Sequence, residues 1–259
     1  MSTSISCIGA GRVIRILLQG MTKKDNLPDR IIVVDTNADI LRNLKQSFPM
    51  IETKTAIDES VTTANFIVIA LHPPAVVDMI KSITPIIGQE SILVSLAPKI
   101  KTTMINQITG GKNPVIRMIP NAPSLVNEGY NPVFFGPGCS DQVRKTFTDL
   151  MAPLGTMPEV AEETLEAYAV ITAMGPTYLW FQLVELIRLG ESFGLSTDEA
   201  NRAVLSMTAG AVKTMQESDL TPAGVMDLVP VKPMADHEET IKGMYTRSLT
   251  GLYGKLTSQ

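Results

Sequence analysis

Residues 4–18 read SISCIGAGRVIRILL, which is an apolar run, a pair of glycines and a second apolar run. The first run predicts a short buried strand and the second predicts a helix, so the glycines fall at a strand-to-helix turn. Gly9 allows the chain to turn sharply, and Gly11 has no side chain to keep a phosphate away from the backbone. The free N–H groups at the start of the helix would then bind a dinucleotide pyrophosphate.

The glycine pattern alone is incomplete, because Ile14 stands where the usual pattern has its third glycine. A further apolar run, at residues 30–34, supports the prediction of a dinucleotide site. Residues 30–34 predict another buried strand, and Asp35 follows it directly. A carboxylate there can accept hydrogen bonds from the ribose 2′-hydroxyl of NAD and would repel the 2′-phosphate of NADP. We therefore expect NAD(P)H as the cofactor, with NAD favoured by Asp35. The alternatives are that Asp35 only caps the next helix, or that a nearby cation accommodates a phosphate: Arg12, Lys45 or Lys54.

The composition is that of an ordinary soluble globular protein. The 259 residues are 44% hydrophobic and 19% charged, and the net charge of −4 gives no indication of binding to nucleic acid or to an anionic membrane. We see no apolar run of membrane-spanning length and no room for a signal peptide before the first strand. Two cysteines could form a disulfide by number, but a reduced protein is the better interpretation. We therefore expect a cytoplasmic protein without membrane or nucleic-acid partners.

Strand and helix patterns alternate through the first half of the chain and helical patterns fill the second. The expected strands lie near residues 4–9, 30–35, 65–70, 91–95, 114–118 and 131–135. Continuous aliphatic strands separated by helices predict a parallel sheet covered on both faces. The expected fold class is α/β, with a Rossmann-type dinucleotide-binding domain in residues 1–160 and an all-α substrate and dimerisation domain in residues 161–259. Because these helices make a thin core alone, we expect a homodimer or a higher homo-oligomer through the C-terminal helices.

In such sheets, ligands lie beyond the carboxyl ends of the strands. We therefore expect the cofactor to contact the glycine turn and the residues that leave each strand. These residues are Gly9, Ala10, Gly11, Arg12, Val13, Asp35, Thr36, Leu71, His72, Pro73, Ala97, Pro120 and Asn121. His72 could instead be a spacer, and the Pro-Asn-Ala-Pro turn around Asn121 could be only a rigid turn with an Asx hydrogen bond.

Residues 117–129, RMIPNAPSLVNEG, resemble the R-x-M-P-N-x-P-x-x-x-x-x-G signature of pyrroline-5-carboxylate reductases, with one extra residue after the methionine. Residues 71–74 look like the family's strand-ending V-K-P, and residues 94–97 look like its V-S-x-A turn. Residues 172–178, TAMGPTY, resemble its S-G-S-x-P-A-Y, and residues 221–229 look like its h-P-x-x-L-x-x-x-V segment. The resemblance covers nearly nine-tenths of the chain. It implies a Rossmann domain followed by a helical dimerisation domain.

The resemblance also implies a small-molecule substrate, with four residues on its side of the site: Asn121, Thr172, Met174 and Gly175. The break at Gly175 and Pro176 would expose helical N–H groups to a substrate carboxylate, or it is a plain proline kink. No catalytic residue is assigned. We expect no metal site, because the neighbouring acids and histidine of residues 236–239 point in different directions on a helix. His237 could act as the acid in place of the family's substrate-binding threonine, which this chain lacks, if the last helix leaned over the pocket of a partner subunit.

One departure from the family leaves the function open. The family's P-G-G-T-T loop, whose threonine binds the imine, has no counterpart after residue 229, where the sequence is PVKPMADH. The first hypothesis is an NAD(P)H-dependent reductase of a small cyclic imine or a related C=N or C=O substrate. The second is a nucleotide-binding paralogue without that activity, which acts as a sensor or assembly partner. A third is that the fold binds another hydride carrier, such as a deazaflavin.

Overall fold

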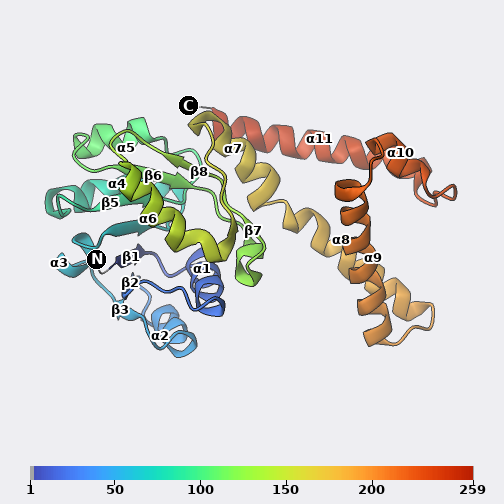
Figure 1. Cartoon of the computed structure of the whole chain (residues 1–259), viewed down its shortest axis with the longest axis horizontal. Helices are drawn as coiled ribbons and strands as arrows, with labels where there is room; N and C mark the ends of the chain where they lie inside the picture. Colours follow the sequence, from blue (N-terminus) through green and yellow to red (C-terminus); the bar gives the residue numbers. More distant parts are fainter. Residues whose placement is uncertain (1–2, 259) are drawn as a thin grey trace. The chain divides into compact units, whose positions relative to one another are not determined.

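The computed structural model describes residues 3–258 (Figure 1). The chain divides into two compact units, of which the first comprises residues up to 174 together with residues from 253, and the second comprises residues 175–252. The sequence instead predicts a boundary after residue 160. The first unit extends further because Leu165 and Ala169 pack against Ile119 in a small buried cluster. The assignment of a function to each domain stays a prediction.

The first unit is built on a seven-stranded sheet in the order β3-β2-β1-β4-β5-β6-β8. Its strands are β1 (Ser4–Ile8), β2 (Arg30–Val34), β3 (Glu52–Lys54), β4 (Phe66–Ile69), β5 (Ile92–Ser95), β6 (Val115–Met118) and β8 (Val133–Phe135). All neighbours pair in parallel except β6 and β8, which are antiparallel. The fold class is therefore confirmed, with a correction for the last strand. Since no crossover helix links β6 to β8, the chain returns in the opposite direction.

Helices cover both faces of this sheet, as the apolar strands predict. They are α1 (Arg12–Lys23), α2 (Ala38–Ser47), α3 (Glu59–Thr62), α4 (Pro73–Ile83), α5 (Thr102–Thr109) and α6 (Asp141–Met151). Consecutive residues of β2 alternate between two buried clusters, with Ile31 and Val33 in one and Ile32 and Val34 in the other. The first cluster includes α1, α2 and α6, and the second includes α3, α4 and α5. A strand buried on both faces needs no polar positions, which explains its continuous apolar sequence.

The end of the first unit holds shorter elements that the sequence does not predict. A two-stranded pair, β7 (Gly129–Tyr130) with β9 (Gly155–Thr156), lies apart from the main sheet. After it, α7 (Leu165–Tyr168) continues into the π-helix η5 (Ala169–Ala173). Single π-turns interrupt the regular hydrogen bonds of a helix and are frequent at functional sites. Here the π-helix contains Thr172, one of the predicted substrate residues, and Met174 follows it directly.

The second unit is helical, as predicted. Its elements are α8 (Pro176–Ser192), α9 (Thr197–Glu217), α10 (Pro222–Asp227) and α11 (Ala235–Thr257), of which the last residues belong to the first unit. Within the unit, Gln182 on α8 donates to the Tyr245 hydroxyl of α11 at 3.0 Å. Few of its side chains are buried. These helices therefore expose many apolar groups.

One stretch, Glu162–Ser192, reaches the length and hydropathy of a membrane span. The expectation that no apolar segment would be long enough to span a membrane is therefore wrong. This is weak evidence for a membrane, because an apolar helix that packs in a protein interface or core meets the same criterion.

Candidate functional site

The glycine turn joins β1 to α1 at the centre of the sheet, where the strand order reverses. Gly9 has a φ of 103°, and its N–H donates to the Val34 carbonyl at 2.7 Å. A Cβ on Gly9 would lie 2.7 Å from the Ala70 carbonyl oxygen. A glycine is therefore required here both for the backbone conformation and for the close approach of β4.

Gly11 has a different environment. It is the N-cap residue of α1, and no side chain caps the helix there. No atom lies within 4 Å of the position that a Cβ would take. Open space beside unpaired helical N–H groups is what a phosphate needs, since the groups donate and the helix dipole favours negative charge. The residues present therefore fit the pyrophosphate of a dinucleotide.

The Asp35 carboxylate lies against the same turn. Its Oδ2 accepts from the Ala10 N–H at 2.9 Å, and its Oδ1 accepts from the Asn37 N–H at 2.9 Å. The cap of α2 is formed by Asn37, whose side chain accepts from the N–H groups of Asp39 and Ile40. Asp35 therefore ties the end of β2 to the glycine turn instead of capping the helix itself.

The other predicted cofactor residues occupy the same edge of the sheet. The Ala70 N–H donates to the Ile8 carbonyl at 2.9 Å, which brings the end of β4 beside the glycine turn. His72 is the N-cap residue of α4, is exposed and makes no capping bond. Ala97 is 2% exposed. The remaining members differ in exposure: Arg12 and Thr36 are exposed, Val13, Leu71, Pro73 and Pro120 are half-buried, and Ala10 is buried.

Asn121 joins three segments at the end of β6. Its N–H donates to Asn131 Oδ1 at 3.1 Å, its Oδ1 accepts from the Tyr130 N–H at 3.0 Å, and its Nδ2 donates to the Thr172 carbonyl at 3.3 Å. Its side chain forms no cap bond to η2 (Ala122–Val126), so the Asx hydrogen bond of the alternative interpretation is not formed there. Asn121 instead places the π-helix beside the end of β6. Sequence reasoning missed Asn131, for which the only signal is a polar residue at the start of the strand predicted over residues 131–135.

Three of the four predicted substrate residues, Thr172, Met174 and Gly175, lie close in sequence to the boundary between the units. Thr172 donates its hydroxyl to the Tyr168 carbonyl at 2.8 Å, and the Met174 N–H donates to the Ala169 carbonyl at 3.2 Å. Both bonds belong to the π-helix of the first unit. Gly175 begins the second unit. The structure therefore brings Thr172 into contact with Asn121, whereas Gly175 belongs to the second unit.

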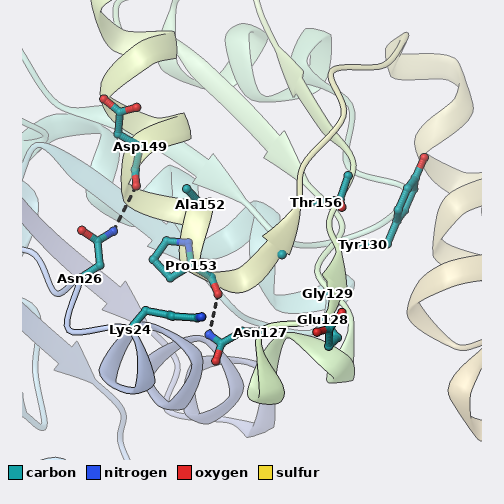
Figure 2. A pocket seen from close by; sticks show the side chains of 11 residues that line it. Lys24, Asn26, Asn127, Glu128, Gly129, Tyr130, Asp149, Ala152, Pro153 and Thr156 are labelled. Carbon is teal, nitrogen blue, oxygen red and sulfur yellow. Dashed lines mark hydrogen bonds between the residues drawn. The ribbon is translucent and has the colours of Figure 1, made fainter.

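A polar cavity of about 760 Å³ lies elsewhere in the first unit (Figure 2). It is bordered by Lys24 after the end of α1 and by Tyr130 and Thr156 of the short β7–β9 pair. The Asn127 side chain donates to the carbonyls of Gly20 and Pro153 there. None of the predicted cofactor or substrate residues lines this cavity, and the glycine turn lies at the other end of α1. This cavity therefore does not mark the predicted site.

His237 lies near the start of α11, and the neighbouring Glu238 pairs with Lys242 at 2.6 Å. Within residues 3–258, histidine, cysteine and acidic side chains form no group of three that could hold a metal ion.

Comparison with known proteins gives two family matches on separate parts of the chain. Residues 4–99 match the family described as NADP oxidoreductase, coenzyme F420-dependent, and residues 162–244 match the pyrroline-5-carboxylate reductase dimerisation family. These two segments contain the glycine turn and most of the helical region. The matches therefore correspond to the two structural parts described above.

Whole-chain relatives agree with this. The chain is 26% identical over 227 residues to a pyrroline-5-carboxylate reductase of Corynebacterium melassecola, covering 85% of this chain and 83% of the relative. It is 25% identical over 254 residues to that of Pseudomonas aeruginosa, covering 97% and 92%. In fold it is similar to the NADP-bound pyrroline carboxylate reductase of Plasmodium falciparum, with a TM-score of 0.82 at 18% identity over 98% and 95% of the two chains.

The glycine turn, the helical second unit and these relatives lead to one assignment. The chain is similar along most of its length to pyrroline-5-carboxylate reductases and is an NAD(P)-dependent oxidoreductase of that type.

Proposed function

We propose that the protein reduces a small cyclic imine, or a related C=N or C=O substrate, with a hydride from NAD(P)H. The open space at Gly11, beside the start of α1 and next to Asp35, is the observation that carries this proposal. The names of the relatives support the substrate class, since the two bacterial relatives described above are called pyrroline-5-carboxylate reductases. Residues 1–160 would bind the nucleotide, and residues 161–259 would complete the substrate site and the oligomer.

Asp35 supports a preference for NADH. Its carboxylate is fixed by two backbone N–H groups, so it cannot turn away without losing both bonds. A second negative charge, the 2′-phosphate of NADPH, would meet it at the adenosine ribose. The hydroxyls of the NADH ribose would instead donate to its free lone pairs.

In the proposed mechanism, the bound nicotinamide supplies the hydride, and the protein positions the acceptor carbon and excludes water. Gly9 and Gly11 would hold the pyrophosphate together with the start of α1, and the residues that follow β4, β5 and β6 would surround the nicotinamide. Thr172 already donates its hydroxyl proton to the Tyr168 carbonyl, so its oxygen can only accept a further hydrogen bond. It is therefore suited to accept from the N–H of a protonated imine, the form that takes up hydride.

The second unit supports a homodimer or a higher homo-oligomer. Large apolar side chains on its helices are exposed, including Phe181 at 67% and Val184 at 66% on α8, and Phe193 at 80% just after it. Several large apolar side chains exposed on the same helices are typical of a surface that another protein covers. The match to a dimerisation family supports a second copy of this chain as its cover. We propose that the oligomer is cytoplasmic, as expected from the composition.

The second candidate is a nucleotide-binding paralogue that does not reduce imines. Residues 229–234, between α10 and α11, contain two prolines and neither a glycine nor a threonine. A loop of this composition cannot donate a threonine hydroxyl to a substrate. This observation favours the second candidate, because it weakens the case for substrate binding and leaves the case for nucleotide binding unchanged.

The test is a titration of the purified protein with NADH and with NADPH, followed by nicotinamide fluorescence. Pyrroline-5-carboxylate and a panel of other cyclic imines are then added to the same samples. We expect tighter binding of NADH than of NADPH, and oxidation of NADH with at least one imine. Binding without oxidation by any imine would reject the reductase and support the paralogue.

A further inference from the structure

The loop between β5 and α5 contains a strained residue. Lys99 has a φ of 74°, in the left-handed region that a residue with a side chain rarely adopts. Such a conformation persists only when surrounding contacts impose it. The contacts around Lys99 therefore show which groups impose its left-handed conformation on the loop.

A buried carboxylate holds the backbone of Lys99. The Lys99 N–H donates to Glu166 Oε1 at 2.9 Å, across 67 positions of sequence. The Lys99 ammonium group also donates to the Lys255 carbonyl at 3.3 Å. Glu166 is 3% exposed, so its hydrogen bond to the loop is shielded from water.

Glu166 is in turn fixed by a fully buried guanidinium. Arg117 on β6 is 0% exposed and donates from Nη2 to Glu166 Oε1 at 2.7 Å and from Nη1 to Glu162 Oε1 at 3.1 Å. Glu162 accepts from the Thr102 N–H at 2.7 Å and from the Thr102 hydroxyl at 2.9 Å. The two carboxylates thus bind both ends of the segment from Lys99 to Thr102.

Stability alone does not explain this buried group of Arg117, Glu162 and Glu166, because removing three charges from water is unfavourable. One buried cation faces two buried carboxylates, and the Arg117 Nε–H has no hydrogen-bond partner among residues 3–258. Buried ion pairs are often no better for stability than apolar residues of similar volume, although they can fix one specific geometry. The geometry fixed here is that of a loop at the carboxyl edge of the sheet.

The position of the loop connects it to the cofactor. In a doubly wound sheet the dinucleotide crosses the edge at the point where the strand order reverses, with one nucleotide on each side. Asp35 follows β2 on one side of β1, and β5 lies on the other side, beyond β4. The residues that leave β5, from Ala97 to Lys99, therefore lie on the nicotinamide side.

We propose that Glu166, anchored by Arg117, is a positioning residue that holds Lys99 in its left-handed conformation and so fixes the β5–α5 loop for the nicotinamide half of the cofactor. This inference rests on the proposed function, because it assumes that a nicotinamide dinucleotide binds at this edge. It assigns no contact between Glu166 and the cofactor. Its effect passes through the loop.

The test compares NADH with ADP-ribose, which keeps the adenosine half and lacks the nicotinamide. Glu166→Gln removes the charge with little change in volume. We expect the Kd for NADH to rise about tenfold, the effect of losing roughly one hydrogen bond to a charged group, while the Kd for ADP-ribose changes less than about twofold. Adding Lys99→Gly to this variant should recover about threefold or more of the NADH affinity, because glycine adopts a positive φ without strain.

Glu163→Gln is the matched control, because Glu163 lies on the same turn and is exposed. It should leave both Kd values unchanged. Lys99→Pro provides a second variant that keeps the buried ion pairs, in case Glu166→Gln does not fold. Proline removes the N–H and restricts φ to about −65°, so the Kd for NADH should rise more than tenfold and that for ADP-ribose should not.

NADH affinity within twofold of the wild type in Glu166→Gln or in Lys99→Pro would overturn the inference. Equal losses for NADH and ADP-ribose would overturn it as well, since they would indicate a general structural role. A wild-type protein that binds neither NADH nor NADPH would refute the proposed function, and this inference with it. Wild-type binding with unaffected variants refutes the inference alone.

Discussion

Substituting Gly11 by alanine should separate nucleotide binding from folding. The residue has φ of −71° and ψ of −174°, which alanine adopts freely, and no atom lies within 4 Å of the new methyl group. Replacing glycine at a compatible position changes stability by about 0.4–1 kcal/mol, usually in the stabilising direction. We therefore expect the free energy of unfolding of Gly11→Ala to stay within about 1 kcal/mol of the wild type.

Binding should respond much more strongly. The methyl group would occupy the space next to the first N–H groups of α1, which the pyrophosphate needs. Displacing the phosphate by about one methyl radius would lose one or two hydrogen bonds to a charged group, each worth roughly 1.5–3 kcal/mol. The Kd for NADH should therefore rise at least about tenfold, since 1.4 kcal/mol is a factor of ten.

Fluorescence titration with NADH and chemical denaturation of the same samples measure both effects. Gly9→Ala is the matched comparison, because its Cβ would lie 2.7 Å from the Ala70 carbonyl oxygen at a φ of 103°. That variant should lose about 1–3 kcal/mol of stability, from backbone strain and steric overlap. An unchanged NADH affinity in folded Gly11→Ala would refute the assignment of the phosphate to this turn.

Three further predictions follow from single residues. Asp35→Ser should raise the ratio of NADPH to NADH affinity at least about tenfold, by removing the charge that repels the 2′-phosphate; an unchanged ratio in paired titrations would reject that function of Asp35. Gly20→Ala should destabilise the protein by about 1–3 kcal/mol in urea unfolding, because its Cβ would overlap the Ser124 carbonyl oxygen, and a neutral effect would contradict that packing. Burial raises the pKa of the Cys7 thiol to about 12, so the folded protein keeps it protonated and unreactive at pH 8. Stability should fall as the pH rises above the ordinary pKa of a thiol toward 12, because the unfolded chain ionises first; rapid modification of Cys7 in the native Cys139→Ala variant would contradict this.

The sequence predicts the sheet well, because its strands are buried on both faces. In β1 and β2 every residue but the first is buried, so the apolar run marks the strand without help from its neighbours. The glycine turn and Asp35 also follow from local order along the chain. By contrast, β3 has the sequence ETK and is partly exposed, so it gives no apolar signal. The antiparallel direction of β8 depends on how the chain returns after β6, which periodicity does not report.

The side-chain contacts of the site are less predictable, because they join residues distant in sequence. Asn121 pairs with Thr172 across 51 positions, and Lys99 with Glu166 across 67. The sequence shows Lys99 after β5 but does not indicate that the Glu166 carboxylate accepts from its backbone N–H. The resemblance identifies Asn121 as important without indicating that its side chain is engaged by backbone groups.

The most direct test of the proposed function follows the hydride itself. The protein is incubated with pyrroline-5-carboxylate and with NADH deuterated at C4, on each face of the nicotinamide in turn, and the product is analysed by mass spectrometry. The proposed function predicts that one of the two labelled cofactors transfers a single deuterium to the reduced ring. NADH binding by the protein, with no deuterium in any product of this imine or of the wider panel, would contradict it.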